Sequence, residues 1–220
     1  MENFYKKIKK DDQNSMKNPN FNVHHMEAPF RLIIVGASGS GKTNTSLNII
    51  NAFAGTFYNI IIVTKNADEP LYNFLKEKLN GRVQILEGVL NVPKVDEFNK
   101  KEPSLVIFDD LVLDDQRRIA DFYIRCRKLN VSVMFLSQAY FLIDKVIRQN
   151  VNYIILKRVS SMRNLRIIAS DFGLSADADK IIRLYKSVIS SPDIVDFFMI
   201  DCIKSQFRKN FEVINEGVDL

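Results

Sequence analysis

The sequence predicts a single α/β domain in which a mostly parallel central sheet is covered by helices on both faces. Short β-rich runs alternate with helical patterns from Phe30 onward, which is typical of parallel strands joined by crossover helices. A glycine-rich turn joins the first apolar run to the first helical pattern. The chain has 220 residues and 46% hydrophobic content, which is enough for one sizeable core. We therefore expect residues 28–220 to form one domain.

The residues that precede this domain have a different composition. Residues 1–20 are polar, carry five lysines against three acidic residues, and show no sustained apolar face. The segment 1–27 is therefore expected to be a flexible basic arm. His24 and His25 are adjacent, so regular structure would point them in different directions, and we interpret both as surface residues before the first strand.

Apolar and β-branched runs locate the strands, and 3.6-residue patterns locate the helices between them. The expected strands are 30–35, 59–64, 83–86, 105–108, 132–136 and 153–156. The expected helices are 42–53, 69–79, 115–128, 143–149, 164–171 and 178–189. Helices that alternate with parallel strands are expected to cover both faces of the sheet. After Pro192, the run 194–200 is expected to add an edge strand.

The turn after the first strand is a complete P-loop of the pattern GxxxxGK[ST]. Its glycines let the backbone approach phosphates closely, and the helix that follows presents its positive end to them. Lys42 is expected to reach the β- and γ-phosphate oxygens, and the Thr43 hydroxyl to ligate magnesium. ATP and Mg²⁺ are therefore the expected cofactors. The expected nucleotide-binding residues are Gly36, Ala37, Ser38, Gly39, Ser40, Gly41, Lys42, Thr43 and Thr45.

Two further strand ends carry polar residues that suit ATP hydrolysis. The apolar run 105–108 leads into Asp109 and Asp110, which is a Walker B pattern. Asp109 is expected to help hold magnesium, and Asp110 to orient or deprotonate the attacking water, although many P-loop hydrolases carry Glu at this second position. The run 132–136 leads to Gln138, which would lie beside the γ-phosphate if this strand is inserted between the P-loop strand and the Walker B strand.

Composition limits the partners and the compartment. The formal net charge of +5 and the pI of about 9.1 are compatible with an anionic partner beyond the nucleotide. Cys126 and Cys202 are the only cysteines and lie in no CxxC or Cys/His cluster, which argues against a disulfide framework and a zinc site. No apolar run approaches the roughly 20 residues of a membrane span, and the N-terminus lacks a signal peptide. We expect a protein that has no membrane partner and is not secreted.

The ordered set of GASGSGKT at 36–43, LVIFDD at 105–110 and RKLNVSVMFLSQ at 127–138 resembles the FtsK/HerA superfamily. It is most similar to the genome-packaging ATPases of large double-stranded DNA viruses, including the poxvirus type, and of virophages. The resemblance covers about residues 28–156, with a fainter match around 197–211. It implies a RecA-like P-loop NTPase fold of the ASCE type.

The resemblance also implies a mechanism and partners. The family forms rings, here a pentamer or hexamer, that move double-stranded DNA without sequence preference. A capsid or portal-vertex protein is a further implied partner, at the site of virion assembly in the host cell (a cytoplasmic factory or the nucleus) and in the virion. A basic residue of one subunit acts on its neighbour's nucleotide, and both Arg127 and Arg148 match such positions. The expected catalytic residues are thus Lys42, Asp110, Gln138, Arg127 and Arg148.

Several questions stay open at this point. The candidate DNA contacts are Lys157, Arg158, Arg163, Arg166, Lys204 and Arg208, and the sequence does not choose among them. A P-loop nucleoside or nucleotide kinase is the main alternative, and it usually places the Walker B strand directly beside the P-loop strand. A nucleotide-binding structural protein without turnover is another. Strand order decides between the ATPase and the kinase.

Overall fold

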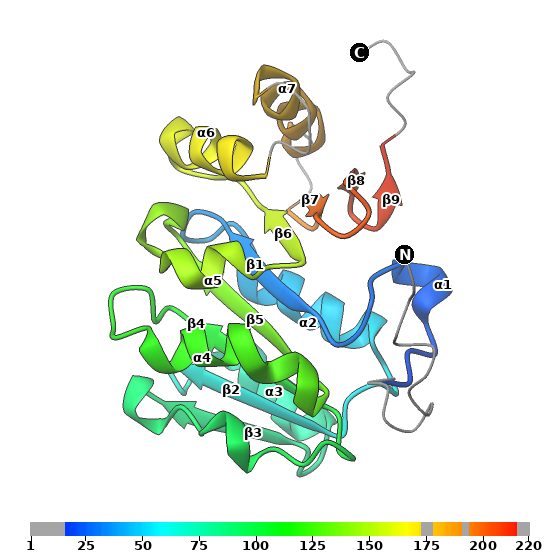
Figure 1. The fold of residues 1–220 in the computed structure, drawn as a ribbon, viewed down its shortest axis with the longest axis vertical. Coiled ribbons are helices and arrows are strands. Elements are labelled where there is room, and N and C mark those ends of the chain that lie inside the picture. Colours follow the sequence, from blue (N-terminus) through cyan, green and yellow to red (C-terminus); the bar gives the residue numbers. More distant parts are fainter. Residues whose placement is uncertain (1–15, 173–177, 191–193, 215–220) are drawn as a thin grey trace, which may run out of the picture.

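The computed structural model describes residues 16–172, 178–190 and 194–214. Within them the strands form one nine-stranded sheet of order β3-β2-β4-β5-β1-β6-β7-β8-β9 (Figure 1). Strands β1 to β6 run parallel to one another, and β7 to β9 extend the sheet antiparallel. The bounds are β1 Arg31–Val35, β2 Asn59–Thr64, β3 Val83–Glu87, β4 Ser104–Asp109, β5 Val131–Ser137, β6 Tyr153–Leu156, β7 Phe198–Asp201, β8 Gln206–Lys209 and β9 Glu212–Val213. The predicted mostly parallel α/β sheet is confirmed.

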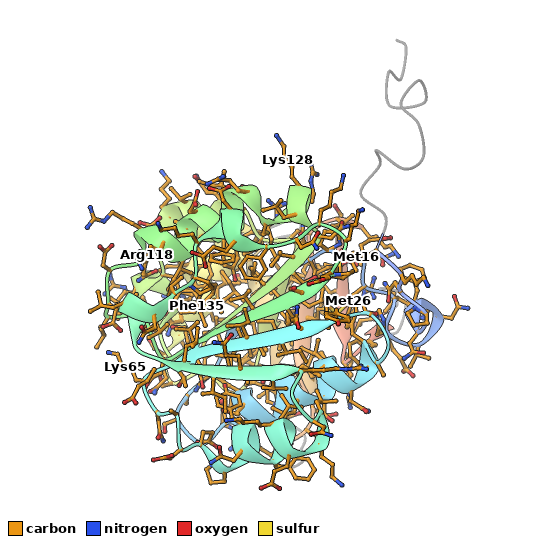
Figure 2. The ribbon with its side chains drawn as sticks, turned by 90° about the horizontal axis from the view of Figure 1, so that it is seen from below. Met16, Met26, Lys65, Arg118, Lys128 and Phe135 are labelled. Atoms are coloured by element: carbon orange, nitrogen blue, oxygen red, sulfur yellow. The ribbon has the colours of Figure 1, made fainter. Side chains whose placement is uncertain are left out.

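Helices cover both faces of this sheet, as predicted. The helices are α1 Phe21–His24, α2 Lys42–Ala52, α3 Pro70–Lys78, α4 Arg117–Arg125, α5 Lys145–Gln149, α6 Met162–Asp171 and α7 Ala178–Ile189. Short 3-10 turns lie at Val89–Asn91, Val95–Glu97, Cys126–Leu129 and Tyr140–Leu142. Apolar residues of α2 and α3 share one core cluster, and those of α4 to α7 share another. In Figure 2 the green α4 side lies above the strands and the cyan helices lie below them. Among the described residues, no helix is long and apolar enough to cross a membrane.

The alternation of β1 shows why this sheet is buried on both sides. Leu32 and Ile34 belong to the cluster under α2 and α3, whereas Ile33 and Val35 belong to the cluster under α4 to α7. Successive side chains of a strand point to opposite faces, so a run that is apolar at every position fits only between two layers of helices. All four residues are fully buried.

Strand β5 lies between β1 and β4, which is the order on which the function of Gln138 depended. In its register, Val35 pairs with Ser137, and Asp109 pairs with Leu136. The P-loop, the Walker B acids and Gln138 therefore leave the sheet at the same carboxyl-terminal edge. The common kinase plan has no strand between β1 and β4, so this order does not favour the kinase alternative.

Two predicted elements end differently from expectation. The helix predicted over 115–128 stops at Arg125 and continues as a 3-10 turn, which closes at Asn130 with a left-handed φ of 55° that Asn tolerates. The single edge strand predicted at 194–200 is wrong: β7 begins at Phe198, is interior, and is followed by β8 and β9. Left-handed turns at Ser205 and Asn210 allow these short strands to fold back on one another.

The described part of the predicted arm packs against the domain. His24, expected at the surface, is fully buried and stacks on Phe53 with ring centroids 3.9 Å apart, while His25 is exposed. Burial, with smaller contributions from His25 and Arg208, lowers the pKa of His24 to about 4. Asn20 also donates to the Ala52 carbonyl at 3.0 Å. The expectation of a flexible arm is therefore wrong for residues 18–27, and residues 1–15 lie outside the described residues.

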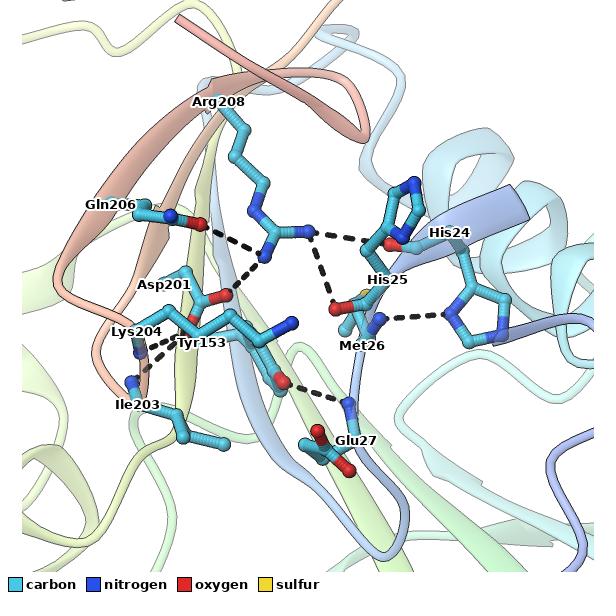
Figure 3. Close-up of polar contacts among 10 residues, drawn as sticks. All are labelled: His24, His25, Met26, Glu27, Tyr153, Asp201, Ile203, Lys204, Gln206 and Arg208. Carbon is cyan, nitrogen blue, oxygen red and sulfur yellow. Dashed lines mark hydrogen bonds and ion pairs between the residues drawn. The ribbon is translucent and has the colours of Figure 1, made fainter. Parts of the chain in front are cut away.

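An ion pair inside the sheet extension fastens this N-terminal segment. Arg208 on β8 and Asp201 on β7 are both buried and form a salt bridge (Figure 3). The same guanidinium donates to the His24 and His25 carbonyls at 3.5 and 3.3 Å. Arg208 is thus a structural residue that joins the hairpin to the segment before β1, and its burial argues against it among the six candidate DNA contacts.

Candidate nucleotide site

The P-loop backbone has a shape that favours glycine at its critical positions. Gly39 and Gly41 have left-handed φ values of 70° and 84°. A Cβ at Gly36 would lie 2.4 Å from Ser40 Oγ and 2.6 Å from Lys157 Cβ, closer than such atoms approach. The loop is therefore held tightly against the end of β6, and the first turn of α2 begins directly after Gly41.

A cavity of about 430 Å³ opens over this loop and gathers residues from the ends of four strands, β1, β2, β4 and β5. It is lined by Ser38, Gly39, Gly41, Lys42, Thr43, Asn44, Thr64, Asn66, Glu69, Leu71, Asp109, Asp110 and Gln138. The structure thus brings together the predicted P-loop, Walker B and Gln138 groups. Gly36, Ala37 and Ser40 belong to the same loop but do not line the cavity. Thr45 is buried, does not line the cavity, and its hydroxyl has no hydrogen-bond partner among the described residues.

The Lys42 ammonium is held over the loop. It donates to the carbonyls of Gly36 and Ala37 at 3.0 and 3.1 Å. Burial lowers the pKa of Lys42 from its ordinary value, and the nearby carboxylates of Asp109 and Asp110 oppose that shift. The lysine therefore lies at the cavity wall facing the two acids, with weak backbone acceptors that a phosphate oxygen could replace.

A buried tyrosine from α3 contacts the first Walker B acid. Tyr72 donates its hydroxyl proton to Asp109 Oδ2 at 2.7 Å. Burial raises the pKa of Asp109, and the hydrogen bond from Tyr72 opposes that rise. Burial and the neighbouring carboxylate also raise the pKa of Tyr72, which keeps it a proton donor, and its hydroxyl interacts with Thr43 as well. Tyr72 therefore links the two residues predicted to hold magnesium.

Sequence reasoning missed Tyr72 because a single tyrosine in an amphipathic helix looks like a core residue. Only the placement of β2 beside β4 brings α3 over the Walker B strand end. Glu69, at the start of α3, lines the cavity for the same reason. The one sequence signal for Tyr72 and Glu69 was that the predicted helix 69–79 follows the predicted strand 59–64 and so begins near the carboxyl-terminal edge of the sheet.

The oxygen donors that face the cavity fit a hydrated magnesium ion. Mg²⁺ prefers hard oxygen ligands and is commonly held by one or two protein oxygens together with substrate phosphates. The Thr43 hydroxyl and the Asp109 carboxylate supply such donors on adjoining walls. Asp110 follows Asp109 with a left-handed φ of 58°, so the turn after β4 aims its exposed side chain differently from that of Asp109.

The two arginines predicted to act on a neighbouring subunit occupy different environments. Arg148 on α5 pairs with Asp171 at 2.7 Å and lies 5.2 Å from the centroid of the Tyr140 ring. Arg127 is exposed in the 3-10 turn before β5, at the amino-terminal edge of the sheet and opposite to the P-loop edge. Figure 2 shows its neighbour Lys128 on the α4 side, away from Lys65, which follows β2. Neither arginine lines the cavity of its own chain.

Several predicted DNA contacts are also distinguished by their burial. Lys157 is only 2% exposed, which argues against it among the six candidate DNA contacts. Lys204 lies over the Phe21 ring, 5.1 Å from its centroid. Arg158, Arg163 and Arg166 are exposed and stay candidates.

A family model described as the poxvirus A32 protein matches residues 19–203. The chain belongs to this family. The match begins at Pro19, which agrees with the packing of the segment before β1. The matched residues include the P-loop, the Walker B strand and β7, so the family relationship spans the whole site.

Curated relatives in this family are named DNA packaging proteins. OPG160 of Variola virus is 28% identical over 142 residues, which cover 58% of this chain and 53% of the relative. OPG160 of Vaccinia virus (strain Copenhagen) gives the same values, and that of Monkeypox virus is 28% identical with 47% of its length covered. The chain spans about half the length of the curated relatives it matches.

Solved structures show the same fold at lower identity. The genome packaging NTPase B204 from Sulfolobus turreted icosahedral virus 2, in complex with AMPPCP, has a TM-score of 0.61 and 13% identity, covering 84% of this chain and 98% of that one. EssC (ATPases 2 and 3) from Geobacillus thermodenitrificans has a TM-score of 0.58 and 12% identity, covering 87% and 41%. The predicted RecA-like P-loop fold is therefore confirmed.

Proposed function

We propose that this protein is a magnesium-dependent ATPase that moves double-stranded DNA during packaging of a viral genome. One observation carries the proposal: the P-loop, Asp109, Asp110 and Gln138 converge on one cavity because β5 separates β1 from β4. The names of the curated relatives and of the structurally similar B204 support DNA packaging as the purpose of that chemistry.

The P-loop binds the triphosphate, and the two acids opposite it bind the metal and orient the attacking water. Lys42 exchanges its two carbonyl acceptors for β- and γ-phosphate oxygens, which are stronger acceptors because they are charged. Thr43 and Asp109 hold magnesium, which when bound neutralises phosphate charge. Tyr72 fixes the orientation of Asp109 and favours its ionised form.

The attacking water is held between Asp110 and Gln138. Both side chains are exposed at the cavity and come from adjacent strands, β4 and β5. Asp110 accepts the proton of the water as general base, and Gln138 donates or accepts a hydrogen bond that orients it. Asp110 lines the cavity from a turn in which its own backbone has a left-handed φ of 58°.

A second subunit is needed because the cavity is short of positive charge. Lys42 is the one cationic side chain among the described lining residues, against the carboxylates of Glu69, Asp109 and Asp110. Phosphoryl transfer usually gains a further cation, and an arginine finger contributes about 10³ to 10⁵ in kcat. Arg127 is exposed and lies at the amino-terminal edge of the sheet, opposite to the P-loop, so it could reach only the nucleotide of a neighbouring copy. We therefore favour Arg127 as the finger in a ring of five or six subunits.

DNA passes through that ring and is contacted through its phosphates. Exposed basic residues such as Arg158, Arg163 and Arg166 supply sequence-independent contacts whose strength falls with salt. The family relationship supports a place at the site of virion assembly inside the host cell, in a cytoplasmic factory or the nucleus, and in the virion. A capsid or portal-vertex protein is the corresponding docking partner.

Two measurements on the purified full chain test this function. The first is ATP turnover with and without double-stranded DNA, comparing the native protein with Lys42→Ala. We expect turnover that DNA stimulates and that Lys42→Ala abolishes. No turnover by the assembled native protein, or turnover that survives Lys42→Ala, would refute it.

The second measurement tests the shared site. Arg127→Ala and Asp110→Asn are each expected to be inactive alone and to recover turnover when mixed, because a mixed ring contains interfaces with one intact finger and one intact base. Lys128→Ala, the adjacent exposed cation, is the matched control and should keep full activity. If the mixtures stay inert at every ratio while Arg148→Ala and Asp110→Asn complement each other, Arg148 is the finger instead.

A further inference from the structure

An apolar segment lies beside the P-loop on the side away from the Walker B strand. Ile194 and Val195 precede β7, and Ile194 is 57% exposed despite its branched aliphatic side chain. A Cβ at Gly41 would lie 3.3 Å from both Ile194 Cγ1 and the Ile194 carbonyl oxygen. Ile194 therefore lies against Gly41, and it is Gly41, not Ile194, that belongs to the lining of the nucleotide cavity.

A buried lysine holds this segment in place. Lys157, directly after β6, donates its ammonium protons to the carbonyls of Ile194 at 2.5 Å, Val195 at 3.1 Å and Asp196 at 2.7 Å. The Asp196 side chain is held separately, by Asn210 at 2.9 Å and by Lys209 at 3.2 Å. Both the backbone carbonyl and the carboxylate of Asp196 therefore hold the segment in place. Lys157 also lies against the P-loop, because its Cβ would be 2.6 Å from a Cβ at Gly36.

The sheet order indicates what this segment faces. Asp109 and Gln138 lie on strands to one side of β1, whereas Lys157 and Ile194 lie beyond β6 on the other side. The γ-phosphate must face Asp109 and Gln138, so the rest of the nucleotide extends the opposite way across the start of α2. We infer that the nucleobase packs on the Ile194 side chain and that Lys157 is the positioning residue for this contact. This inference rests on the proposed nucleotide binding.

The same geometry sets the base specificity of the contact. The three carbonyls of the segment accept protons from the Lys157 ammonium, so they are engaged there and not by the 6-amino group that adenine carries in place of the 6-oxo group of guanine. Ile194 and Val195 offer only hydrocarbon to the base. Packing of this kind discriminates weakly, because discrimination of a hundredfold or more requires hydrogen bonds that one base leaves unpaired. The site should therefore accept ATP and GTP with similar affinity.

The test measures binding of AMPPCP, GMPPCP and tripolyphosphate, each with Mg²⁺, by calorimetry on the full chain. Ile194→Ala should weaken both nucleotides roughly tenfold, as for loss of a hydrophobic pocket contact, and leave tripolyphosphate unchanged. It should also raise KM for ATP at constant kcat, because the base is remote from the reacting phosphate. Ile203→Ala, at a similarly exposed isoleucine in the turn after β7, is the matched control.

Lys157→Met tests the positioning role. Lys157→Met should weaken the binding of both nucleotides and leave the binding of tripolyphosphate unchanged, as Ile194→Ala does. If Lys157→Met fails to fold, Ile194→Ala alone decides. Equal weakening of tripolyphosphate, no effect of Ile194→Ala, or a preference above a hundredfold for one purine would each overturn the inference. Leu71 lines both the nucleotide cavity and the apolar cavity between α2 and α3. If Leu71→Ala weakened nucleotide binding more than Ile194→Ala does, the base would lie on the Leu71 side and the inference would be overturned. If the native protein binds none of the three probes, the proposed function itself has failed.

Discussion

Removal of the Tyr72 hydroxyl perturbs the metal side of the site through one hydrogen bond. In Tyr72→Phe, Asp109 loses the 2.7 Å donor that opposes the effect of burial on its pKa. Hydrogen bonds to charged groups contribute about 1.5–3 kcal/mol, and each 1.4 kcal/mol is a factor of ten. The ratio of ionised to protonated Asp109 should therefore fall about 10- to 150-fold at a given pH. Asp109 must be ionised to hold magnesium, so activity should require higher pH.

The assay is the pH dependence of kcat/KM at saturating magnesium. In the native protein, activity rises as pH increases through the pKa of Asp109, and in Tyr72→Phe this acidic limb should move to higher pH. Activity at the alkaline plateau should be largely retained, because the ring still fills its place in the core. Tyr58→Phe, at an exposed tyrosine, is the control. An acidic limb that does not move in a folded Tyr72→Phe protein would refute the coupling between these two residues.

Three further predictions concern stability and the loop. Burial raises the pKa of Asp109 above its ordinary value of 3.8, so the folded state binds the carboxyl proton more tightly than the unfolded state. The free energy of unfolding that this proton contributes is complete below pH 3.8 and is lost as pH rises through the pKa of the folded state. Asp109→Asn should therefore be more stable than the native protein at neutral pH without magnesium, and equal stability in urea would contradict this. Asp201→Asn leaves Arg208 buried without its ion partner, which should cost about 3–5 kcal/mol and lower Tm by roughly 6–20 °C, whereas Asp201→Leu combined with Arg208→Met should recover most of it. Gly36→Ala places a methyl 2.4 Å from Ser40 Oγ, so AMPPCP affinity should fall more than tenfold, and unchanged binding would show that the loop is less constrained than its geometry indicates.

The sequence predicted the parts of this molecule that depend on local pattern. The six parallel strands, the P-loop and the Walker B acids each follow from apolar runs and glycine spacing that act within a few residues. Gln138 was a conditional prediction, since its position depended on strand order. The observed order β4-β5-β1 satisfies that condition because β5 pairs with both neighbours in register.

What the sequence could not predict depends on contacts between distant segments. His24 is buried because Phe53 stacks on it and Asn18 and Met26 satisfy its ring nitrogens, a combination with no local signal. Lys157 looks like a solvated cation until the segment before β7 supplies three carbonyls to its ammonium. Charged and polar residues of this kind are buried only when tertiary partners compensate for lost hydration.

The most direct test of the central claim is a crystal structure of the protein with Mg²⁺ and AMPPCP. The account predicts the triphosphate across the loop 36–43, with the Lys42 ammonium on its β- and γ-oxygens and the metal beside Thr43 and Asp109. A loop that stays empty at saturating AMPPCP, or a metal remote from Asp109, would contradict it.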